Sequence, residues 1–76
     1  MKTMTCKQLG GACDLEFSAS TFEEIAKLSQ NHGKEMFQQQ DPDHLEAMSK
    51  MMKLAQNPVK VQEWMEEKRK EFNSLP

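Results

Sequence analysis

The chain lacks any run of apolar residues close to the ~18 that a membrane-spanning helix needs, so no membrane partner is expected. The first residues, MKTMTC, carry one positive charge and no apolar stretch, which is unlike a secretory signal. Without either kind of segment, a cytoplasmic location is the default expectation.

A basic stripe is also missing. The 10 Lys and Arg residues are interleaved with 12 Asp and Glu residues, and the formal net charge is -2. Proteins that bind nucleic acid usually cluster Lys and Arg on one face, where these side chains neutralise phosphates. The charge pattern therefore predicts no nucleic-acid partner.

Aromatic residues are scarce, at 7% of the chain, and apolar residues make up only 37% of its 76 residues. A single core in a chain below ~70–80 residues rarely supplies more than ~3–5 kcal/mol. Such domains often add a disulfide, a metal ion or a partner subunit. We therefore expect one small domain, residues 1–76, that strengthens its core in one of these ways.

The N-terminal part predicts a two-stranded β-hairpin. Residues 14–19 alternate between polar and apolar, which is the period of a half-buried strand, and residues 2–6 can pair with them across a Gly10-Gly11 turn. The expected inward-facing residues of the second strand are Leu15, Phe17 and Ala19.

Three helices are expected to follow, with Thr21, Asp41 and Asn57 as their capping residues. The second and third caps each precede a proline, which suits the first position of a helix. The predicted fold class is therefore α+β, an N-terminal two-stranded hairpin packed against three helices. Residues 1–37 hold the hairpin and first helix, and residues 38–76 form a two-helix C-terminal extension.

Helical spacing predicts which residues face inward. Gly33 lies inside the first helix, where glycine costs ~1 kcal/mol relative to alanine, so it marks a close backbone approach, a bend or an end. The expected inward residues are Phe22, Ile25, Leu28, Ser29, His32 and Met36 on the first helix, Leu45, Met48, Met52 and Ala55 on the second, and Val61, Trp64, Met65, Lys68 and Phe72 on the third.

Cys6, Cys13 and His32 are the candidate metal ligands. The two thiols can face each other across the hairpin, and His32 projects from the helix packed on it. Thiolate and imidazole are donors that zinc prefers. Met36 lies one turn further along the same face, so its thioether is a candidate fourth ligand. The spacing Cys-x6-Cys is wider than that of zinc knuckles. The expected cofactor is one zinc ion or another transition metal, or none.

Several alternatives stay open. The cysteines also fit buried apolar residues or a disulfide, His32 fits a hydrogen-bonded core histidine, and His44, beside acidic residues, is expected to be exposed. Copper(I) would suit a softer set of sulfur ligands. That set would be Met4, Cys6, Cys13 and Met36.

The sequence contains no glycine-rich phosphate-binding loop and no closely spaced pair of pocket carboxylates, and no third residue completes a Cys–His nucleophile, so we expect no enzyme. Three functions remain. The first is a non-enzymatic protein with a metal or thiol site. The second is a metal-free interaction module that binds a protein partner or forms a homodimer. The third is a thiol-redox protein that cycles a Cys6–Cys13 disulfide.

Residues 3–37 resemble a family of very small bacterial and archaeal proteins catalogued as "predicted small metal-binding protein". The run TCKQLGGACD, then Phe17, then TFEEI and NHG carry the resemblance. The resemblance implies that Cys6, Cys13 and His32 are metal ligands. Many members have a second histidine four residues after the first, where this chain has Met36. The resemblance therefore leaves the fourth ligand open among water, a carboxylate such as Glu35, and a group from a partner.

Overall fold

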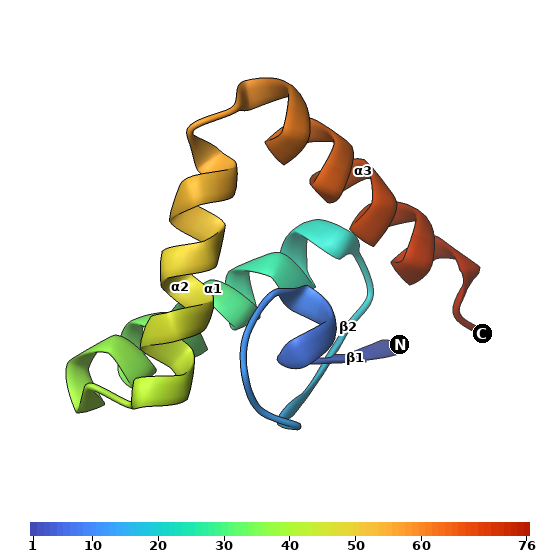
Figure 1. The fold of residues 1–76 in the computed structure, drawn as a ribbon. Coiled ribbons are helices and arrows are strands. Elements are labelled where there is room, and N and C mark those ends of the chain that lie inside the picture. The colour runs from blue at the N-terminus through green and yellow to red at the C-terminus, as the bar shows by residue number, and fades with distance from the viewer.

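A computed structural model describes residues 1–76 and shows the expected α+β fold. Strand β1 (Lys2–Thr5) leads into one turn of 3₁₀ helix, η1 (Lys7–Leu9), and strand β2 (Glu16–Ala19) follows. Three helices complete the chain: α1 (Phe22–Gln39), α2 (Pro42–Ala55) and α3 (Pro58–Ser74) (Figure 1). No helix has both the length and the apolar character needed to cross a membrane.

The two strands pair antiparallel, with Met4 opposite Phe17. Both of these side chains are buried, as is Ala19, so the alternation in β2 is confirmed for its last residues. Leu15 was predicted to face inward but is 48% exposed. It lies just before β2, in a loop whose backbone bonds to the start of η1, so the alternating pattern of a strand does not apply to it.

All three predicted helix caps are confirmed. Thr21 Oγ1 accepts a hydrogen bond from the Glu24 N–H at 3.2 Å. Asp41 and Asn57 accept from the first N–H groups of α2 and α3, and each precedes a proline in the first helical turn. Gly33 does not end α1, which continues to Gln39.

The helices are arranged around the hairpin in two different ways. Helix α1 packs on β2, while α2 and α3 diverge from their connecting turn like the arms of an inverted V (Figure 1). The C-terminal end of α3 returns to the strands, where Lys2 Nζ donates to the Asn73 carbonyl at 2.9 Å. The two termini consequently lie on the same side of the molecule (Figure 1).

The core is small and lies between the hairpin, α1 and the end of α3. It consists of eight buried residues, Met4, Cys6, Leu9, Phe17, Ala19, Phe22, Ile25 and Phe72. No apolar residue of α2 is among them. The prediction for α2 was wrong in part, because Met52 is 69% exposed and Ala55 is also exposed. Helix α2 instead turns its first-turn residue His44 inward.

Candidate metal centre

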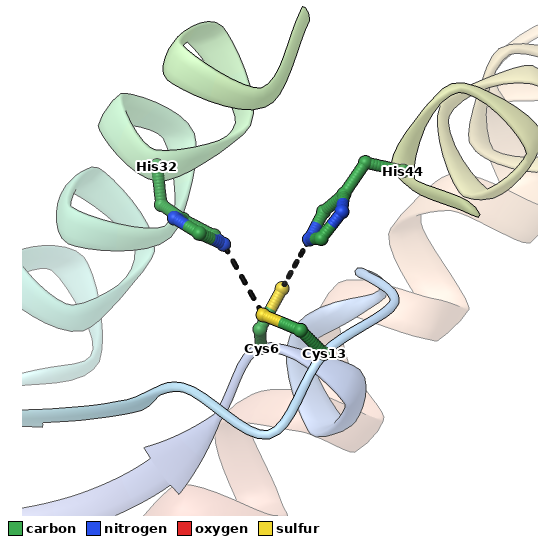
Figure 2. Close-up of side chains that lie close together, drawn as sticks. All are labelled: Cys6, Cys13, His32 and His44. Carbon is green, nitrogen blue, oxygen red and sulfur yellow. Dashed lines mark hydrogen bonds between the residues drawn. The ribbon is translucent and has the colours of Figure 1, made fainter. Parts of the chain in front are cut away.

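The loop after β1 brings the two thiols to one place. Cys6 is the residue before η1, and its N–H donates to the Leu15 carbonyl at 2.8 Å. Lys7 N–H donates to the Cys13 carbonyl at 3.0 Å, and Gly11 N–H donates to the Cys6 carbonyl at 2.7 Å. These bonds fold the loop back on itself, so Cys6 and Cys13 lie on the same side of it as free thiols (Figure 2).

His32 approaches the thiols from α1. Its Nε2 lies 3.3 Å from Cys13 Sγ. The imidazole packs edge-on against Phe17, with ring centroids 5.7 Å apart, so β2 supports one side of the ring. The predicted meeting of Cys13 with His32 between hairpin and helix is therefore present in the structure.

His44 is the fourth member of the cluster, and it comes from the first turn of α2. Its Nε2 lies 3.6 Å from Cys6 Sγ (Figure 2). The residue is only 6% exposed, so the prediction that His44 faces solvent was wrong. The acidic neighbour Asp41 does not draw the imidazole outward. It accepts a hydrogen bond from His44 Nδ1 at 2.6 Å while the ring stays buried.

Cys6, Cys13, His32 and His44 offer four ligand atoms that all lie within 4.8 Å of one another. A zinc ion bonded to sulfur at ~2.3 Å and nitrogen at ~2.0–2.1 Å sets neighbouring ligand atoms ~3.3–3.8 Å apart in a tetrahedron. The Cys6–His44 and Cys13–His32 separations already match that spacing. The other separations would shorten by at most about 1.5 Å, so the four residues can hold one metal ion.

The carboxylate of Asp41 orients His44 for this purpose. Because an ionised carboxylate only accepts hydrogen bonds, the 2.6 Å contact places the proton of a neutral His44 on Nδ1. The lone pair of Nε2 then points at the sulfur atoms. Carboxylate–histidine pairs of this kind are the usual outer support of metal-bound imidazole.

The pKa values of the two thiols are shifted in opposite directions. Burial raises the pKa of Cys6, but backbone N–H groups of Cys13 and Ala12 and the His44 side chain bond the sulfur, and the net pKa is lowered. Burial and the nearby Cys6 sulfur raise the pKa of Cys13. The hydrogen bond to Asp41 raises the pKa of His44 against the opposing effect of burial. The pKa values of Cys6 and His44 are thus shifted in opposite directions, each toward the charged form of its side chain.

Met36 and Met4 are the two candidate thioether ligands that the sequence suggested. Met36 is half-buried on α1, one turn after His32, and Met4 is packed in the hydrophobic core. Four nitrogen and sulfur ligands are available without either thioether and without Glu35, which is exposed. Met36 as a ligand stays a prediction that the geometry of the cluster does not require.

A local sequence signal for His44 does exist. In Asp41-Pro42-Asp43-His44 the capping aspartate precedes the histidine by three residues, so its carboxylate can bond both the backbone N–H and the ring of His44. A histidine held in this way is pre-oriented at a helix N-terminus. The signal identifies a fixed imidazole, but it does not say which other residues the ring will meet.

The chain matches no protein-family model, and no curated protein and no solved structure is similar enough to count as a match. The resemblance of residues 3–37 to the predicted metal-binding family therefore stays a prediction. The case for a metal site is carried by the four clustered side chains. One of them, His44, lies outside the residues that carry that resemblance.

Proposed function

We propose that this chain is a small, non-enzymatic zinc-binding protein in which Cys6, Cys13, His32 and His44 hold one ion. The observation that carries the proposal is the convergence of four nitrogen and sulfur atoms within 4.8 Å, from three separate parts of the chain. Two thiolates and two imidazoles in a tetrahedron are the donor set that zinc prefers. Copper(I) prefers a set of ligands with more sulfur atoms than this one.

The proposed role of the ion is structural. Four protein ligands fill a tetrahedral shell and leave no position for water or substrate, which is the arrangement of structural rather than catalytic zinc. The ion would join the Cys6–Cys13 loop to α1 and α2, and the apolar core lacks side chains of α2. The two ligand thiols must stay reduced, so the same proposal favours a reducing compartment such as the cytoplasm.

Native mass spectrometry on protein purified without chelator or affinity metal tests the proposal. We expect one zinc ion per chain, which is lost on acid denaturation. A metal-free mass with two intact thiols in the presence of added zinc would overturn the proposal. A mass reduced by two hydrogen atoms would instead indicate a Cys6–Cys13 disulfide and support the thiol-redox alternative.

Two variants separate the candidate fourth ligands. His44→Gln should lower zinc affinity by more than the ~10–100-fold that loss of an outer-shell partner costs, because it removes a direct ligand. Met36→Leu keeps the size of the side chain and should leave zinc affinity unchanged. Both affinities can be measured by competition with a chelating dye. The reverse result would assign the fourth position to Met36.

A further inference from the structure

A second concave site lies beside the metal centre. It is a cavity of about 710 Å³ between α1, α2, α3 and the Gly10-Gly11 turn. The diverging arms of α2 and α3 stand above α1 and this turn (Figure 1). The volume of the cavity falls within the ~300–1,000 Å³ that is typical of pockets for small molecules. Cys6 and His44 contribute to its wall, so the cavity adjoins the four-residue cluster.

The lining of the cavity is free of charged side chains. None of its 19 residues is Asp, Glu, Lys or Arg, although these types make up 29% of the chain and about five or six would be expected at that frequency. Twelve of the 19 are hydrophobic. An unpaired charge in such a place would lose its hydration without gaining a partner. The lining therefore suits an uncharged, largely apolar occupant.

All three glycines of the chain line this cavity. Gly10 has φ 94°, which favours glycine, and a Cβ there would lie 3.1 Å from the Trp64 ring. No comparable constraint requires glycine at position 33, because a Cβ on Gly33 would meet only Met48, at an ordinary contact distance of 3.7 Å. Glycine destabilises a helix interior relative to alanine, so the packing of the chain does not explain Gly33. Its missing side chain leaves space in the cavity.

The hydrophobic part of the lining is adaptable. Four of the seven methionines line the cavity. Methionine side chains are flexible and polarizable, and they are common on surfaces that accept apolar ligands of varied shape. The only tryptophan, Trp64, lies in the same wall and provides a flat apolar surface. The four methionines are Met48, Met51, Met52 and Met65.

We propose that this cavity binds an uncharged, largely apolar small molecule, at a site that shares Cys6 and His44 with the metal centre. A second copy of the chain fits the cavity less well. The helices of a second copy carry charged residues beside their exposed apolar side chains, and the lining offers no partner to any charge that is brought into it. A small neutral ligand has no such cost.

The test uses N-phenyl-1-naphthylamine, a neutral apolar dye, on the zinc-loaded full chain. Excitation of Trp64 should transfer energy to the bound dye, with saturation at one dye per chain. Gly33→Leu should weaken binding by about tenfold or more, because the added side chain takes up ligand space. Asn31→Leu adds the same side chain to an exposed position of α1 outside the lining, so it should leave binding unchanged.

Zinc content and circular dichroism identify a Gly33→Leu chain that does not fold. Ser29→Leu, one turn earlier on the same wall, then replaces it with the same expected loss. Absent or unsaturable dye binding, or equal binding by the cavity variants and Asn31→Leu, would overturn the proposal. If the wild type sediments as a dimer and Gly33→Leu sediments as a monomer, the cavity is an interface with a second copy. That result would also overturn the proposal. Saturable dye binding by a chain that takes up no zinc would support the cavity and reject only the metal proposal.

Discussion

At the scale of single residues, Asp41 has two roles that depend on one carboxylate. Its Oδ2 accepts the backbone N–H of His44 at 3.1 Å, which caps α2, and the ring Nδ1–H at 2.6 Å, which orients the imidazole. The shared hydrogen bond raises the pKa of His44 and lowers that of Asp41. The Asp41 carboxylate therefore fixes both the start of α2 and the orientation of the His44 ring, a candidate metal ligand.

The substitution Asp41→Asn separates these roles, because asparagine also caps helices well but carries no charge. A raised His44 pKa adds stability below its ordinary value of 6.5, which is lost as pH rises through the folded-state pKa. A lowered Asp41 pKa adds stability above 3.8, which is lost as pH falls through the folded-state value. In EDTA and reductant, the Tm advantage of the wild type should thus be largest between these pH values.

Thermal unfolding followed by circular dichroism across the acidic and neutral range measures this difference. A wild-type advantage that does not vary with pH would contradict the role of the charge pair. In the zinc-loaded protein, Asp41→Asn should also reduce zinc affinity by ~10–100-fold, as loss of an outer-shell partner usually does.

At the scale of elements, the turn between the two cysteines is sensitive to a single methyl group. A Cβ at Gly11 would overlap Cys6 Sγ and would lie 3.1 Å from the Cys6 carbonyl oxygen, which accepts the Gly11 N–H. Cys6 Sγ or the loop backbone would have to shift to admit this Cβ. The loop between β1 and β2 thus holds Cys6 in place by passing close to it.

We therefore expect Gly11→Ala to lower zinc affinity by at least ~10–100-fold, the loss that follows from disturbing the support of a ligand. Gly33→Ala is the matched control, because it adds the same methyl group inside α1 without a clash. It should keep full zinc affinity and raise Tm by about 4–8 °C, since the exchange is worth up to ~1 kcal/mol. Equal zinc affinity in the two variants would contradict the close packing of Gly11 on Cys6.

At the scale of the whole molecule, the candidate metal centre and the apolar core join different parts of the chain. The core joins the hairpin, α1 and α3, where Phe72 packs edge-on against Phe22 and Arg69 bonds Glu23 at 2.6 Å. Helix α2 adds no apolar residue to it and reaches the cysteine loop through His44. A bound ion would therefore fix the element that the core holds least.

Zinc should accordingly raise global stability. A ligand at 100 times its Kd that binds only the folded state adds about 2.7 kcal/mol, which corresponds to a Tm increase of about 10–20 °C for a domain of this size. Calorimetry of the reduced protein with zinc and with EDTA measures the shift. The variant lacking both Cys6 and Cys13 should show no shift, and an unchanged wild-type Tm would contradict a structural ion.

The features that the sequence by itself determined are local ones. The three helix caps depend on a side chain and the next few N–H groups, and the turn depends on adjacent glycines, so both could be predicted without knowing the fold. The approach of Cys13 to His32 was also predictable, because a hairpin and the next helix pack together.

Only the tertiary structure decided how α2 is rotated about its axis. Helical spacing is satisfied equally by several neighbouring faces, and the choice depends on what the helix meets. Packing against α1 and the cysteine loop turned His44 inward and left Met52 outside the apolar core. The same rotation completed the four-residue cluster and left a cavity without charged lining residues between α1, α2, α3 and the Gly10-Gly11 turn. Both sites join residues far apart in the chain, and local patterns carry no information about such contacts.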